Sequence, residues 1–207
     1  MVKAVIFDFD GTLADTREVL YNVYQKIAEK YGYKILTKEE LETLKGLSVK
    51  ERIKKLGMPL PKVPSLLKEG REMCGRYMDT CPAYPGIPEL LSQLKEKGFF
   101  LGIVSSNSEK NIKTFLNAHG LNMVDSIATT SGLLGKHRII AKLLYNNGIK
   151  KEEAIYVGDE LRDINSCKSL PVKIIAVAWG YDGGSVLKDA EPDYLVNHPE
   201  EILGIVN

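Results

Sequence analysis

Short apolar runs recur along the chain at intervals that suit the strands of a buried sheet. Residues 2–7 are apolar apart from Lys3 and rich in β-branched side chains, which is typical of a strand covered on both faces. Similar runs predict strands at residues 101–105, 126–130, 154–157, 174–178 and 194–196. Apolar residues at helical spacing between them predict helices at residues 88–97, 109–118 and 137–145. This alternation predicts an α/β fold, a Rossmann-like parallel sheet sandwiched between helices.

A long stretch without any strand pattern interrupts the alternation after the first strand. Residues 15–31 and 65–78 can each form a helix, and Thr37 and Ser48 each precede a glutamate by three residues, which is the spacing of a capping box. The insertion has about 65 residues, far more than the dozen that a simple crossover between parallel strands needs. We therefore predict two domains: a core of residues 1–14 and 82–207, and an inserted all-helical cap domain of residues 15–81.

Composition and charge narrow the class of protein. The 207 residues carry a formal net charge of +1, so no nucleic-acid or membrane-surface partner is predicted. No apolar run approaches the roughly 20 residues that cross a bilayer, and the N-terminus does not resemble a secretion signal. The three cysteines lie far apart and are odd in number, which suits free thiols in a reducing compartment. We expect a cytoplasmic protein, either monomer or dimer.

Two acids follow the first strand directly. Asp8 and Asp10 project to the same side of the chain, at the end of a strand where open α/β sheets bind ligands. Like charges this close are costly unless a cation neutralises them or one takes a proton, and carboxylate oxygens suit a hard ion such as Mg²⁺. Gly11 then allows the backbone to turn sharply and to approach a ligand. The alternative is that both acids only cap or turn the chain.

Polar residues follow the next three predicted strands as well. Ser105 begins a Ser-Ser-Asn run that could bind a phosphoryl oxygen or cap a helix. Lys136 precedes a helix, where a surface lysine is the alternative, and Asp159 and Asp163 follow the fourth strand, where both could be helix caps. Acids, a hydroxyl and an amine at successive strand ends favour one shared site over four separate coincidences.

In their order these motifs resemble those of the haloacid dehalogenase superfamily across essentially the whole chain. Four sets of residues are similar to its four motifs: Asp8 to Thr12, Ser105, Lys136, and Asp159 with Asp163. The helical insertion resembles the cap of the phosphoglycolate phosphatase-like subfamily.

This resemblance implies a phosphatase that uses Mg²⁺. Asp8 would be the nucleophile that forms an aspartyl-phosphate, Asp10 the general acid and base, and Lys136 with Ser105 would offset charge on the phosphoryl group. The implied metal ligands are Asp8, the backbone carbonyl of Asp10, Asp159 and, either ligating or supporting, Asp163. The implied substrate-binding residues are Gly11, Thr12, Ser106, Asn107 and, in the insertion, Gly46.

Departures from the family's patterns favour one activity over others. Dehalogenases of the superfamily lack an acid at the position of Asp10, so its presence favours phosphoryl chemistry. Val49 and Leu20 stand where the β-phosphoglucomutase branch has an arginine and a histidine, although Lys50 or Arg52 could substitute. We expect hydrolysis of a small phosphomonoester, such as phosphoglycolate or a sugar phosphate. The alternatives are a phosphomutase or pyrophosphatase of the same superfamily, and a binding module without catalysis.

Overall fold

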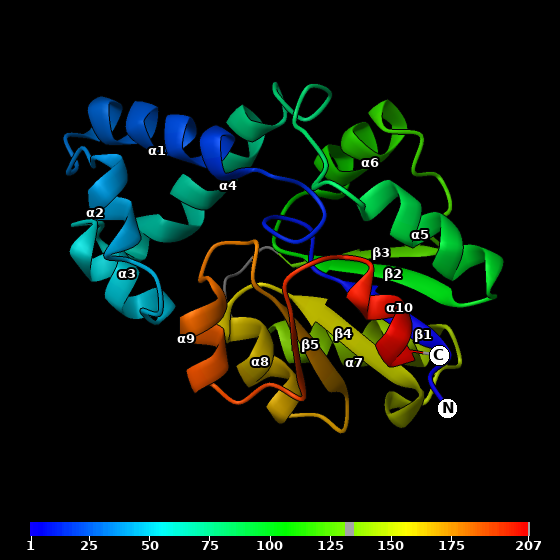
Figure 1. The fold of residues 1–207 in the computed structure, drawn as a ribbon. Coiled ribbons are helices and arrows are strands. Elements are labelled where there is room, and N and C mark those ends of the chain that lie inside the picture. Colours follow the sequence, from blue (N-terminus) through cyan, green and yellow to red (C-terminus); the bar gives the residue numbers. More distant parts are fainter. Residues whose placement is uncertain (131–134, 207) are drawn as a thin grey trace.

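The computed structural model describes residues 1–130 and 135–206, and a parallel sheet forms its centre (Figure 1). Its strands are β1 (Ala4–Phe7), β2 (Phe100–Ser105), β3 (Ser126–Thr129), β4 (Ala154–Gly158), β5 (Lys173–Val177) and β6 (Tyr194–Val196). Their order is β3-β2-β1-β4-β5-β6, and every pair of neighbours is parallel. The predicted α/β fold is confirmed.

Strand β1 lies at the centre of this sheet. The chain first adds β2 and β3 on one side of β1 and then adds β4, β5 and β6 on the other side. Strand β1 pairs with β2 on one side and β4 on the other, so that Phe7 lies beside Ile103 and Val157. This change of side is the switch point at which open α/β sheets bind ligands, beyond the carboxyl ends of the strands. The residues that follow β1, β2 and β4 therefore meet at one edge of the sheet.

Helices cover both faces of the sheet, because successive side chains of each strand point to opposite sides. One face packs Val5 and Phe7 of β1 against α5 (Ile87–Glu96), α6 (Glu109–Ala118) and α10 (Glu201–Val206). The other packs Ala4 and Ile6 against α7 (Lys136–Asn146), α8 (Leu161–Lys168) and α9 (Gly184–Asp189). This double burial explains why β1 is apolar along its whole length.

The predicted insertion forms a helical lobe, which Figure 1 shows standing off one end of the sheet. Its helices are α1 (Arg17–Tyr31), α2 (Lys38–Glu42), α3 (Val49–Lys55), the short 3₁₀ helix η1 (Leu60–Lys62) and α4 (Val63–Cys74). Both predicted capping boxes are present: Thr37 at α2 and Ser48 at α3 each accept a hydrogen bond from the backbone N–H three residues on.

The two connections between lobe and sheet run side by side. Asp15 donates its N–H to the carbonyl of Pro82 at 2.9 Å, and Tyr84 donates to the carbonyl of Leu13 at 3.0 Å. These bonds tie the entry and the exit of the lobe to each other. The division into domains at residues 15 and 81 is consistent with this crossing point but stays a prediction, and residues 131–134 and 207 of the predicted core lie outside the described residues.

Several elements begin or end at residues other than those predicted. Strand β1 begins at Ala4 rather than at residue 2, because pairing with β2 and β4 starts only there. Helix α4 occupies residues 63–74 rather than 65–78, since Pro64 is tolerated in a first turn and Gly75 follows the last helical residue. Helices α9 and α10 have only six residues each, too few to show a helical period in the sequence. Within residues 1–130 and 135–206, no helix combines the length and the apolar character that crossing a membrane requires.

Candidate active site

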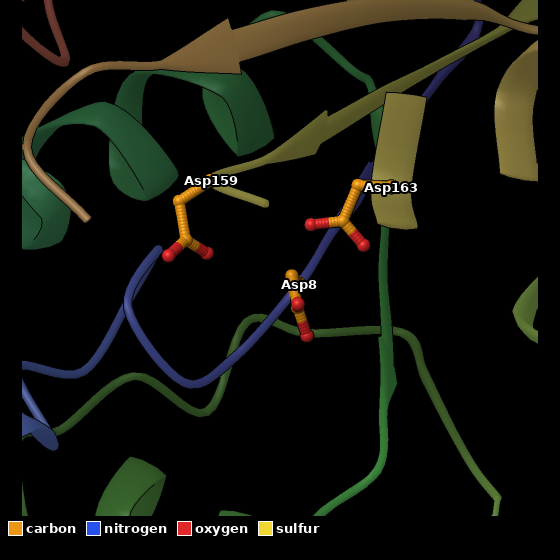
Figure 2. Close-up of side chains that lie close together, drawn as sticks. All are labelled: Asp8, Asp159 and Asp163. Atoms are coloured by element: carbon orange, nitrogen blue, oxygen red, sulfur yellow. The ribbon is translucent and has the colours of Figure 1, made fainter. Parts of the chain in front are cut away.

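Three buried carboxylates converge at the carboxyl ends of β1 and β4. Asp8 follows β1, Asp159 follows β4 and Asp163 lies in the first turn of α8, and none of the three is more than 1% exposed. One oxygen from each lies within 4.8 Å of the other two, and Figure 2 shows the side chains turned toward a common space. This arrangement gathers three oxygen donors at one point.

Local structure explains why the acids meet there. The backbone N–H of Asp8 continues the pairing of β1 with β4 by donating to the carbonyl of Val157 at 2.8 Å. Asp163 accepts the backbone N–H of Glu160 at 3.1 Å, as the acidic member of a capping box at α8. Gly158 leaves the room this needs, since a Cβ added there would lie 2.6 Å from an oxygen of Asp163.

The electrostatics of this cluster favour a bound cation. Burial, together with the neighbouring carboxylates of Glu160 and Asp8, raises the pKa of Asp159 well above its usual value. A divalent ion among these oxygens would stabilise the charged form of each acid. An all-oxygen donor set is the one that Mg²⁺ prefers, so the residues fit that ion.

Lys136, at the start of α7, supplies a positive charge to the same cluster. Its Nζ lies 2.5 Å from Oδ2 of Asp8 and 2.6 Å from Oδ1 of Asp163, and the side chain is 5% exposed. Burial alone would lower its pKa, but the carboxylates of Asp163 and Asp8 raise it above the usual value and keep the amine charged. The alternative of a surface lysine is therefore wrong.

Asp10 turns away from this cluster and toward β2. The side-chain N–H group of Asn107 donates to Oδ1 of Asp10 at 3.0 Å, and the Ser105 hydroxyl lies 3.4 Å from Oδ2. Burial raises the pKa of Asp10, although the hydrogen bond from Asn107 opposes this shift. A carboxyl group held in this way, beside but outside the carboxylate cluster, is suited to proton transfer.

Gly11 and Thr12 both lie against Asp159. A Cβ at Gly11, whose φ is +80°, would lie 2.2 Å from an Asp159 oxygen, so only glycine fits this turn. The hydroxyl of Thr12 donates to Oδ1 of Asp159 at 2.7 Å. The described contacts of Thr12 therefore orient an acid of the cluster, and its predicted contact with substrate stays a prediction.

The remaining predicted substrate residues are divided between two places. Ser106 and Asn107 line a cavity that Asp10 also lines, between the sheet and the helical lobe. Gly46 does not line that cavity: its N–H donates to Oδ1 of Asp182 at 3.2 Å. The structure thus places Gly46 at a contact between lobe and sheet, and its role in binding substrate also stays a prediction.

An ion-pair network beside the site was not predicted. Arg52 on α3 lies 2.8 Å from Glu160 and 2.5 Å from Asp182, and the second carboxylate oxygen of Glu160 lies 2.5 Å from Arg162. Although burial opposes it, Arg162 and Arg52 hold the pKa of Glu160 below its usual range. Glu160 and Arg162 lie between Asp159 and Asp163 in the sequence, so their place in the fourth motif was a signal from which they could have been predicted. Asp182 belongs to no motif, so the sequence offered no such signal for it.

Comparison with known proteins agrees with this fold. The model of the haloacid dehalogenase-like hydrolase family matches residues 5–177. A phosphoglycolate phosphatase of Synechococcus elongatus is 31% identical over 206 residues, which cover 99% of this chain and 97% of the relative. Pyrophosphatase PpaX of Bacillus velezensis is 27% identical over 211 residues, covering 99% and 96%.

Solved structures share the fold at lower identity. A haloacid dehalogenase-like family hydrolase of Streptococcus pneumoniae superposes with a TM-score of 0.85 at 20% identity, covering 100% of this chain and 99% of its own. CbbY of Rhodobacter sphaeroides, solved in complex with phosphate, gives 0.77 at 24% identity, covering 98% and 96%.

The parallel sheet, the carboxylates at its strand ends and these matches together indicate a hydrolase. The chain belongs to the haloacid dehalogenase-like hydrolase family. Within that family it is a phosphatase, so the predictions of family and enzyme class are confirmed.

Proposed function

We propose that this chain is a Mg²⁺-dependent phosphatase that hydrolyses a small phosphomonoester through an aspartyl-phosphate on Asp8. The observation that carries the proposal is the position of Asp8, buried between the amine of Lys136 and the carboxylates of Asp159 and Asp163. Phosphoryl chemistry is also the activity named for the relatives from Synechococcus elongatus and Bacillus velezensis.

Two residues carry the covalent steps. A carboxylate oxygen of Asp8 attacks phosphorus, the bond from phosphorus to the alcohol oxygen breaks, and Asp10 gives that oxygen its proton. Asp10 then takes a proton from a water molecule that attacks the same phosphorus, which releases inorganic phosphate and restores Asp8. Asn107 and Ser105 hold Asp10 for both transfers.

Charge on the transferring group is offset by residues that are already in place. Lys136 is fixed by Asp8 and Asp163, so it need not reorganise during the reaction. Asp8, Asp159, Asp163 and the Asp10 carbonyl would hold Mg²⁺, which when bound neutralises charge on phosphoryl oxygens. Thr12 keeps Asp159 in position through its hydrogen bond.

The helical lobe acts as a cap in this proposal. Residues 15–81 would close over the strand ends by bending at the paired connections around Asp15 and Pro82, which excludes bulk water from the aspartyl-phosphate. All three cysteines are buried and free, which supports placing the enzyme in the reducing cytoplasm.

Phosphate release from a panel of compounds tests the proposal. The panel contains small phosphomonoesters, including phosphoglycolate, and pyrophosphate, each with Mg²⁺ and with EDTA. We expect release by the wild type with Mg²⁺ and none by Asp8→Asn, while Asp189→Asn, an exposed aspartate on α9, serves as the matched control and keeps full activity. Turnover by Asp8→Asn at the wild-type rate would rule out the covalent mechanism.

The same panel separates the second candidate function. This second candidate is a pyrophosphatase, because the relative from Bacillus velezensis is named pyrophosphatase PpaX. A kcat/KM for pyrophosphate well above that of every ester would make this chain a pyrophosphatase with the same nucleophile.

A further inference from the structure

A cavity of about 360 Å³ lies between the helical lobe and the strand ends. Asp10, Ser106 and Asn107 form its floor, so it borders the residue proposed as acid and base. Pockets of roughly 300–1,000 Å³ are the size that encloses drug-sized ligands. The cavity therefore has room for a substantial leaving group beyond the phosphate.

The roof of this cavity is aliphatic. It is built from side chains of α1, α3 and α4 and of the turn between them: Leu20, Val23, Ile27, Val49, Ile53, Leu56, Met58, Val63, Leu66 and Leu67. Only Val23, Ile27 and Leu66 are fully buried, and no residue of α3 is. The lobe thus presents aliphatic side chains that its own packing leaves partly uncovered.

Three arginines line the cavity, Arg52 on α3, Arg71 on α4 and Arg162 on α8, and each already has a partner. Arg52 binds Glu160 and Asp182, and Arg162 binds the same glutamate. Arg71 donates to the backbone carbonyl of Ser106 at 3.0 Å. Arg52 and Arg71 come from the same helices as the aliphatic side chains, but each bonds to residues outside the lobe, Arg52 to Glu160 and Asp182 and Arg71 to Ser106.

This mainly aliphatic lining of the lobe favours one kind of substrate. A carboxylate or a second phosphate placed against the aliphatic side chains would lose its hydration, and the arginines that line the cavity are already bonded to other residues. Burying such an anion is therefore unfavourable. A hydrocarbon body would cover apolar side chains that are otherwise exposed to water, which is favourable in proportion to the apolar area removed from water.

We propose that the substrate of this site is the phosphate monoester of an apolar alcohol, alkyl or aryl. Its phosphate would lie at Asp8 and Asp10, and its hydrocarbon body would fill the space under α1, α3 and α4. This inference rests on the proposed phosphatase function and adds the chemistry of the leaving group.

The inference is tested by the rate of phosphate release from alkyl phosphates of increasing length. Ethyl, butyl, hexyl and phenyl phosphate are compared with phosphoglycolate and pyrophosphate, using the full chain with Mg²⁺. Burying one methylene is worth about fourfold in affinity, so we expect kcat/KM to rise on the order of a hundredfold from ethyl to hexyl phosphate. Phosphoglycolate should be a poorer substrate than butyl phosphate.

Variants in the lobe connect this preference to the roof. Ile53→Gln, at a half-buried position of the roof, should reduce the hexyl-to-ethyl ratio of kcat/KM by at least tenfold. Ile35→Gln is the matched control, because Ile35 is 59% exposed in the same lobe and does not line the cavity; it should leave the ratio unchanged. If Ile53→Gln does not fold, as judged by circular dichroism, Leu67→Gln on α4 replaces it.

The outcomes separate the two proposals. Hydrolysis that needs Asp8 but does not increase with chain length, or that favours phosphoglycolate, would overturn the apolar substrate and leave the phosphatase standing. An unchanged ratio in Ile53→Gln or its replacement would do the same. Absence of phosphate release from every ester would overturn the proposed function itself, and the substrate class with it.

Discussion

Arg52 of the helical lobe donates a hydrogen bond to Asp182, which follows β5, with 2.5 Å between Nη2 and Oδ1. Asp182 is 1% exposed and also accepts the backbone N–H groups of Gly46 and Leu161. One carboxylate therefore joins the lobe to the start of α8, the helix that carries Asp163. Through Arg52 the position of the lobe is coupled to the carboxylate cluster.

Replacing Arg52 by methionine is expected to weaken this coupling. The variant leaves Asp182 buried without its cation, and breaking such a pair is destabilising even though Arg52 itself is a quarter exposed. We expect kcat/KM to fall by about tenfold or more, because the lobe then covers the site less of the time. Steady-state kinetics measures this, and limited proteolysis should show faster cleavage within residues 15–81.

Lys54→Met provides the matched control on the same helix. Lys54 is an exposed residue of α3 outside the ion-pair network. The kcat/KM and the rate of proteolysis of Lys54→Met should therefore stay at wild-type values. Equal losses in the two variants would show that α3 tolerates no substitution, and would contradict a specific role for Arg52.

Replacing Lys136 by methionine is expected to remove most of the activity. Its amine contacts both Asp8 and Asp163, and losing one preorganised electrostatic contact to a transition state costs roughly 10²–10³-fold in kcat. Lys142→Met, at an exposed position of the same helix, should keep the wild-type kcat. A kcat for Lys136→Met within threefold of the wild type would contradict the role assigned to this amine.

Asp10→Asn should separate proton transfer from covalent attack. Asparagine can still accept the hydrogen bond from Asn107 but cannot give or take a proton, so turnover should fall by ~10²–10⁴-fold. With 4-nitrophenyl phosphate, whose leaving group needs little protonation, one equivalent of nitrophenol should appear rapidly before slow turnover. Turnover within twofold of the wild type would show that Asp10 is not the acid and base.

Mg²⁺ should stabilise the folded chain through Asp159. A ligand at a hundred times its Kd adds about 2.7 kcal/mol of stability, which for a chain of this length corresponds to a rise in Tm of about 5–10 °C. Differential scanning calorimetry with Mg²⁺ and with EDTA measures the rise, which Asp159→Asn should abolish and Asp189→Asn should keep. A rise of equal size in Asp159→Asn would place the metal elsewhere.

Much of the fold could be read from the sequence because parallel strands have a local signature. A strand covered on both faces is continuously apolar, and β1 shows this over Ala4–Phe7. The carboxyl ends of neighbouring parallel strands lie at one edge, so polar residues that follow directly, such as Asp8 and Asp159, had to come close. The same reasoning predicted that Ser105 shares a site with these acids, and its hydroxyl lies 3.4 Å from Oδ2 of Asp10.

The tertiary structure decided the contacts that link distant segments. Thr12 binds Asp159 across 147 positions and Arg52 binds Asp182 across 130, and neither pair follows from a local pattern. The same holds for the aliphatic roof, because Ile53 and Leu67 have the spacing of ordinary core residues in the sequence and only the arrangement of α1, α3 and α4 leaves them facing a cavity.

Hydrophobic period and strand ends are properties of one segment, so the sequence by itself determined the fold and the acids of the site. Which side chains of separate segments meet depends on how those segments pack, and that packing determined the orientation of Asp159, the attachment of the lobe and the chemistry of the space above Asp10.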